Sequence, residues 1–156
     1  MLRQIERSRF IVWFSLITML LLAFVLAWQK VDREASDTAL LVVSKRILEQ
    51  ANVYKQQWLL EKQPEQISIN QKFIKYSANG WVTPLNSANK VDCKYWLDTF
   101  YQQERVLESL PIKFEDSSIG SDFQCEYTYS RGQAINISLI DGKFRVGVIF
   151  SSEHKN

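Results

Sequence analysis

The sequence predicts an α+β fold in which an N-terminal transmembrane helix continues into a long stalk helix packed on a small antiparallel β-sheet. Three observations support this class: an uncharged apolar run, a helical pattern without Pro or Gly, and alternating short segments with turn residues. We therefore divide the chain into a cytoplasmic tail (1–9), a transmembrane helix (10–28), an exported stalk helix (29–63) and an exported α+β domain (64–156).

The apolar run Phe10 to Trp28 holds nineteen residues without charge, Pro or Gly. As a helix rising about 1.5 Å per residue it spans roughly 28 Å, close to the hydrocarbon thickness of a bilayer. A cleavable signal peptide shares the basic start and the apolar run, but its apolar core is usually shorter, and Trp28 suits an interfacial anchor. We expect an uncleaved anchor; both interpretations place the following chain outside the cytoplasm.

The flanking charges predict the orientation of this anchor. Three arginines and one glutamate precede it, whereas residues 29–37 hold two basic and three acidic side chains. Positive residues near a spanning segment tend to stay cytoplasmic, so the N-terminus should lie inside. The net charge of +2 lies in the first 28 residues, and the remaining sixteen basic and sixteen acidic residues balance. The exported part therefore shows no electrostatic footprint for nucleic acid.

The stalk helix is predicted from residues 35–62, which are rich in good helix formers and are followed by Pro64. Nothing forces a break after Trp28, so anchor and stalk are expected to be continuous. One helical face collects the apolar residues Leu40, Val43, Ile47, Ala51, Tyr54 and Trp58. Its second half is expected to pack on the chain's own sheet. Leu40 and Val43, nearer the membrane, are expected to lie beyond the domain and to contact a partner helix.

The exported domain is predicted to hold short strands and one more helix. A strand at residues 73–77 precedes the turn Asn79-Gly80, and a second helix should run from Asp92, its N-cap, to about Leu110. Its expected apolar face holds Trp96, Phe100, Leu107 and Leu110. Strands at residues 134–140 and 143–150 should form a hairpin across Asp141-Gly142, and residues 123–129 a further strand.

Cys93 and Cys125 are the two cysteines, and both lie on the exported side, where an oxidising compartment lets thiols pair. We expect a disulfide that closes a loop of about 33 residues and contributes roughly 3 to 4 kcal/mol in the chain-entropy model. Two buried free thiols or a metal site are the alternatives. No His or third Cys accompanies the pair, so we expect no metal and no other cofactor.

A membrane-embedded helix whose second half packs on a small antiparallel sheet, with one late disulfide, resembles the type IV pilin and pseudopilin plan. The stretch FIKYSANGWVTP (73–84), the CKYW that starts at Cys93 and the single later Cys125 are similar to the MshF family, accessory proteins of MSHA type IV pilus biogenesis. The resemblance implies a pilin-like fold, a bacterial inner-membrane location, a periplasmic domain, and pilus-assembly proteins or pilins as partners.

The processing signature of true pilins is missing from this chain. A prepilin is cut after a Gly that precedes the apolar segment, and the mature chain usually has Glu at its fifth position. Here Arg9 precedes Phe10, and the fifth residue from Phe10 is Phe14. The sequence therefore favours a protein that stays in the inner membrane over a cleaved and polymerised subunit.

Catalytic chemistry has little support in the sequence. His154 is the only histidine and lies in the C-terminal tail, and Glu115-Asp116 lacks the ligand spacing of an EF-hand, so we expect a solvated loop there. We expect a non-enzymatic accessory protein that acts through protein–protein contacts. The alternative is a single-pass, membrane-anchored periplasmic sensor or ligand-binding domain, which needs a pocket with convergent polar groups.

Five residues are candidates for partner contact, besides a possible homo-oligomer through the stalk. Ala23 and Ala27 form a small-xxx-small pair in the anchor, and Leu40 and Val43 lie on the proximal stalk. Trp81 is either a recognition aromatic on a loop or a plug of the core, and we favour the core because large aromatic side chains are mostly buried.

Overall fold

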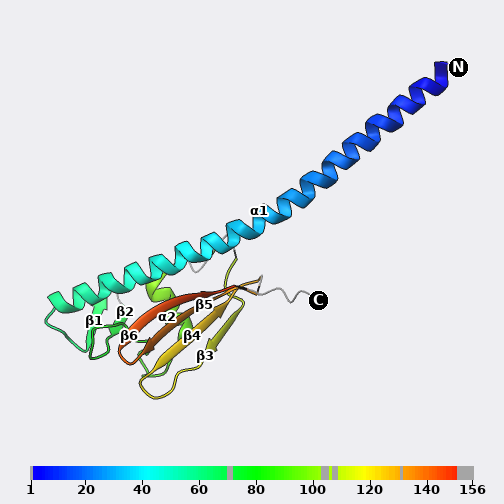
Figure 1. Ribbon diagram of the computed structural model, residues 1–156. Helices are drawn as coiled ribbons and strands as arrows, with labels where there is room; N and C mark the ends of the chain where they lie inside the picture. Colours follow the sequence, from blue (N-terminus) through cyan, green and yellow to red (C-terminus); the bar gives the residue numbers. More distant parts are fainter. Residues whose placement is uncertain (1, 70–71, 103–105, 107–108, 131, 151–156) are drawn as a thin grey trace. The chain divides into compact units, whose positions relative to one another are not determined.

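The chain divides into two compact units, Met1–Asp37 and Thr38–Asn156, in a computed structural model. The structure describes residues 2–69, 72–102, 106, 109–130 and 132–150; side chains of residues 2–8 and 29–37 lie outside the description. Helix α1 (Leu2–Leu60) contributes residues to both units (Figure 1). The expected continuity of anchor and stalk therefore stays a prediction.

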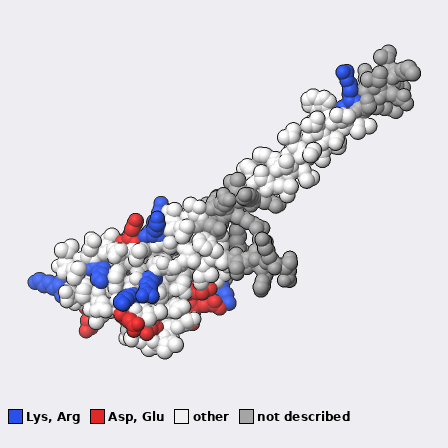
Figure 2. Space-filling view, in the orientation of Figure 1, with Lys and Arg blue, Asp and Glu red and all other residues white. Residues whose placement is uncertain are grey.

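The first unit contains the apolar segment Arg9–Trp28, which is helical and is long and apolar enough to cross a membrane. None of this segment is buried inside the protein, and its visible surface in Figure 2 is uncharged beyond the basic group at its start. The hydroxyl of Thr18 donates to the carbonyl oxygen of Phe14 at 2.8 Å. This bond lets a polar side chain sit in an apolar segment, because its donor is satisfied by the helix itself.

The second unit is built around the part of α1 that starts at Thr38. Every residue of the predicted apolar face is buried: Leu40, Val43, Ile47, Ala51, Tyr54 and Trp58. They form one cluster with the buried residues of the second helix and of the sheet. The spacing of three and four residues thus identified the face that α1 buries.

The end of α1 is fixed by backbone geometry. Lys62 and Gln63 adopt positive φ values of 64° and 60°, and the Gln63 N–H donates to the Trp58 carbonyl at 2.9 Å. Bonds of this kind satisfy carbonyls that the last helical turn leaves without partners. The indole N–H of Trp58 then donates to the carbonyl of Pro64 at 2.9 Å, which ties the chain after the helix back to it.

Six strands form two antiparallel sheets in the second unit. The smaller sheet pairs β1 (Gln66–Ile69) with β2 (Lys72–Lys75). The larger sheet has the order β3-β4-β5-β6, formed by β3 (Lys113–Asp116), β4 (Phe123–Thr128), β5 (Ala134–Ile140) and β6 (Lys143–Ile149). The β5–β6 turn is the predicted Asp141-Gly142, with φ values of 51° and 68° that suit a two-residue hairpin.

The larger sheet buries one face. Its central strands pair Phe123 with Leu139, Cys125 with Ile137, and Tyr127 with Ile135, and all six side chains are buried. The residues between them on β4 are partly exposed. The alternation agrees with a sheet that packs on a core with one face and meets solvent with the other.

Helix α2 (Cys93–Phe100) is shorter than the sequence predicted. Asp92 caps it as expected, its carboxylate accepting from the Tyr95 N–H at 2.9 Å. The predicted extension to Leu110 is wrong: Tyr101 leaves helical geometry, while Val106 and Pro111 are buried and Leu110 is exposed. Val106 and Ser109 exchange two backbone hydrogen bonds of 2.9 Å, an arrangement that an α-helix does not contain, so tertiary context overrides local helix propensity here. Leu107 lies outside the described residues.

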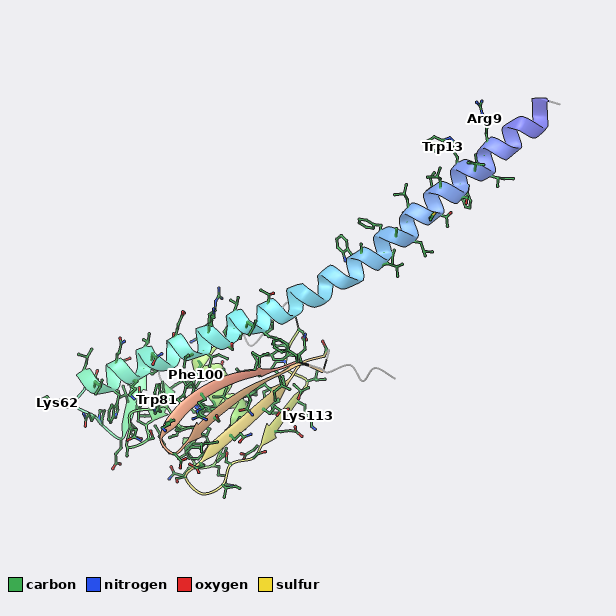
Figure 3. All side chains as sticks on the ribbon, in the orientation of Figure 1. Arg9, Trp13, Lys62, Trp81, Phe100 and Lys113 are labelled. Carbon is green, nitrogen blue, oxygen red and sulfur yellow. A yellow bond between two sulfur atoms is a disulfide. The ribbon has the colours of Figure 1, made fainter. Side chains whose placement is uncertain are left out.

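Aromatic rings join the second unit's elements around Phe144 of β6. Its ring centroid lies 5.3 Å from those of Trp81 and Phe100 and 6.0 Å from that of Trp96. Figure 3 labels the side chains of Trp81 and Phe100. Trp96 also donates its indole N–H to the Val82 carbonyl at 3.0 Å. Phe144 therefore ties β6 to α2 and to the segment that follows the Asn79-Gly80 turn.

Two buried tyrosines give a stability prediction. The Tyr127 hydroxyl donates to the Cys93 carbonyl at 2.7 Å, whereas the buried Tyr76 hydroxyl has no partner among the described residues. Tyr127→Phe should lower the free energy of unfolding by about 1 to 2 kcal/mol, because it removes a buried hydrogen bond. Tyr76→Phe is the matched control and should be neutral or stabilising in urea titrations. A larger loss from Tyr76→Phe would contradict this assignment.

Alkaline pH should destabilise the second unit through the same groups. Burial raises the pKa of Tyr76 to about 12 and raises the pKa of Tyr127 as well. An unfolded tyrosine releases its proton near pH 10, so above that pH the unfolded state binds fewer protons and stability falls as pH rises. The urea midpoint should stay level below pH 10 and decline from pH 10 to 12. Tyr127→Phe should flatten this decline, and an unchanged slope would refute the attribution.

Candidate protein-interaction surface

The five residues that the sequence proposed for partner contact fall into three situations. Ala23 and Ala27 are exposed on the apolar helix of the first unit. Leu40 and Val43 are buried in the core of the second unit, and Trp81 is partly buried beside that core. Within the second unit, Leu40, Val43 and Trp81 do not form one exposed surface.

The expectation that the domain leaves Leu40 and Val43 uncovered is wrong. Only 1% of Leu40 and 5% of Val43 is exposed, and both belong to the same cluster as Trp58. The second unit begins at Thr38, so its core already covers the first turns of this part of α1. A charge at either position would be buried without a partner, and the first effect would be on folding.

The Trp81 side chain is neither fully exposed, as an aromatic recognition residue would be, nor fully buried in the core. Its ring stacks on Phe144 with an interplanar angle of 20°, and the Lys55 ammonium nitrogen lies 4.1 Å from its ring centroid. The preceding Gly80 has φ of 78°, and a Cβ there would come within 2.2 Å of the Trp58 ring. The turn is thus pressed against the end of α1, and Trp81 is engaged by the chain's own residues.

Apolar side chains that the sequence analysis did not single out are exposed on α1 of the second unit. We call them the outer apolar residues: Leu41, Val42, Leu48, Val53, Leu59 and Leu60. They are 39% to 84% exposed. Single exposed apolar residues are ordinary, but a gathering of them on one element is typical of protein contact sites.

The outer apolar residues form two lines along the helix. At about 100° per residue, Leu41, Leu48 and Leu59 share one direction within about 20°, and Val42, Val53 and Leu60 share another. The exposed polar residues Lys45, Glu49 and Gln56 lie between the two lines. The signal was present in the sequence as a second set of apolar spacings, but the buried face has the stronger pattern.

Two open hollows on the second unit bear on the sensor alternative. One, of about 530 Å³, lies beside Tyr54, Thr99 and Phe100; the other, of about 690 Å³, lies beside Trp58 and Tyr76. Several polar groups that line them are engaged internally: the Tyr54 hydroxyl donates to the Thr99 carbonyl at 3.2 Å, and Trp58 donates to Pro64. Arg46, Glu49 and Gln50 also line the first hollow, and the Tyr76 hydroxyl at the second has no partner among the described residues, so the sensor alternative stays a prediction.

The disulfide brings three chemically active side chains together. Cys93, at the start of α2, is bonded to Cys125 on β4, with their Cα atoms 5.6 Å apart, so the expected pairing is present. The Asp116 carboxylate lies beside them, and the three ligand atoms are within 4.8 Å of one another. Because the sulfurs are bonded to each other, they offer no thiolates, and the group is not a metal site. Glu115 and Asp116 are exposed as expected, but they belong to strand β3 and not to a loop.

Comparisons with known proteins give no relative. No family model matches the chain, and no curated protein or solved structure matches it significantly.

Neighbouring leucines on α1 provide a test of which face is open. Leu40→Glu should lower the free energy of unfolding by more than about 3 kcal/mol, because it buries an unpaired charge. Leu41→Glu, one residue along and 46% exposed, should change it by less than about 0.5 kcal/mol. Urea unfolding of detergent-solubilised protein measures both. Equal destabilisation would show that Leu41 is covered too.

Proposed function

We propose that this protein is a non-enzymatic accessory protein of type IV, MSHA-type pilus biogenesis, held in the bacterial inner membrane and acting through protein–protein contacts. The observation that carries the proposal is that the two parts of α1 differ in burial and packing. Its first part has no buried residue and is apolar enough for a bilayer, and its second part holds a disulfide-bonded α+β unit while exposing further apolar residues.

The architecture supports a relationship to pilins, but we propose that this chain is neither cleaved nor polymerised as a pilin is. An apolar N-terminal helix, helical residues packed on an antiparallel sheet and a late disulfide are the features of the pilin plan that the sequence suggested. Arg9 stands where a prepilin would have its cleavable Gly. We infer that the chain is retained in the inner membrane, with its N-terminus in the cytoplasm and the second unit in the periplasm.

The outer apolar residues are the surface that we assign to partner contact. They replace Leu40 and Val43, which fold the domain and are not available to another protein. A helix that presents apolar lines on either side of a polar strip can pack against helices of a pilin or of another assembly protein. Within the bilayer, we assign Ala23 and Ala27 separately to helix contact.

Co-purification from membranes tests this function. Leu41→Glu combined with Leu48→Glu should leave the protein abundant and disulfide-bonded but reduce recovery of its partners at least ten-fold, because an unpaired charge in an interface is costly. Gln56→Glu, on the polar strip, is the matched control and should retain wild-type recovery. Pilus output should fall in parallel with partner recovery.

Three results would refute the proposal. If the double variant keeps its partners and pilus output while deletion of the protein abolishes pili, the outer apolar residues are not the contact surface. If the proteins recovered with the wild type include no pilin or pilus-assembly component, the pilus assignment itself is wrong. Recovery of a second, differently tagged copy alone would indicate a homo-oligomer and would also contradict the assignment to a partner protein.

A further inference from the structure

The Cys93–Cys125 disulfide has a carboxylate held against it. Asp116 on β3 is the register partner of Cys125 on β4, and its carboxylate lies within 4.8 Å of both sulfurs. The Ser118 N–H donates to the Asp116 Oδ1 at 2.9 Å, so a local turn orients the group. The Cys93 sulfur also lies 3.7 Å from the Glu115 carbonyl oxygen. The exposed side of the disulfide is therefore electronegative.

The two bonded cysteines are both buried, but to different degrees. Cys125 is fully buried, whereas Cys93 retains 7% exposure at the start of α2. The exposed Asp116 side chain stands beside this approach. The nearby basic residue Lys113 forms an ion pair with Glu115, and by strand alternation both side chains lie on the opposite face of β3 from Asp116. No ion pair among the described residues neutralises Asp116.

Reduction of a disulfide requires an anion to enter this region. The attacking species is a thiolate, so a fixed carboxylate near the sulfur opposes its approach. The same charge raises the pKa of a cysteine thiol released there and makes its sulfur a poorer leaving group. Both effects act in the same direction and slow reduction.

We propose that Asp116 is an electrostatic guard that protects the Cys93–Cys125 disulfide from thiol reductants. In the guarded reaction an external thiolate attacks the Cys93 sulfur, forms a mixed disulfide and expels the Cys125 thiolate, which takes a proton. A second external thiolate then attacks the external sulfur, releases the Cys93 thiolate and leaves as the oxidised reductant. Two reductant thiolates supply the two electrons, and Asp116 raises the barrier to the first step.

The experiment compares reductants of different charge on the intact protein in detergent. Reduction by 2-mercaptoethanesulfonate and by cysteamine is followed by alkylation at matched thiolate concentrations. Asp116→Asn, which keeps the oxygen that accepts from Ser118, should speed reduction by the anionic thiol about four-fold, as expected for a unit charge at about 5 Å in water. The gain with cationic cysteamine should be smaller, and 0.5 M salt should shrink the difference.

Glu115→Gln is the matched control, because it removes the same charge one residue away on the other face of the strand. It should change the rate less than two-fold. Equal rates for wild type and Asp116→Asn, or an acceleration that is independent of reductant charge, would overturn the proposal. The latter result would mean that reduction follows unfolding, with no attack on the folded disulfide.

Discussion

Burial of one face of α1 is the interaction on which the second unit depends. The strands alone form a two-stranded hairpin and a four-stranded sheet, and sheets of this size need a covered face to be stable in water. Leu40, Ile47 and Ala51, each at most 1% exposed, supply the cover together with α2. The same face also brings Trp58 to the Gly80 turn, so the helix fixes the small sheet and the loops as well as the large sheet.

The disulfide has a different task in this arrangement. It joins α2 to β4, two elements that also meet through the Tyr127–Cys93 hydrogen bond. A covalent link between elements that already pack chiefly limits the unfolded chain and adds little new contact. The disulfide matters for stability because the core of this domain is small. A carboxylate that slows its reduction would extend the time over which the link persists.

Features set by strong local chemistry could be predicted from the sequence. Asp141-Gly142 predicted its hairpin because both residues accept positive φ, Pro64 marked the helix end, and Asp92 capped α2. Predictions were wrong where contacts between residues far apart in the sequence determine the local structure. The residues after Phe100 include good helix formers, but α2 ends at Phe100, Val106 and Pro111 are buried, and Val106 pairs with Ser109. Glu115 and Asp116 of β3 were expected in a loop because an exposed edge strand shows little alternation. Similarly, no local pattern states how far along α1 the core extends, which is why Leu40 was expected to be open.

Adjacent residues on α1 differ sharply in burial, and this difference has an evolutionary consequence. Leu40 is buried while Leu41 and Val42 are exposed, so the direction of each side chain depends on its place in the helical sequence. A one-residue insertion after Ile47 would rotate every later side chain of α1 by about 100° relative to Leu40, Val43 and Ile47. It would turn Tyr54 and Trp58 out of the core in a single step. This segment can therefore change by substitution, but its length is constrained far more strictly than its composition.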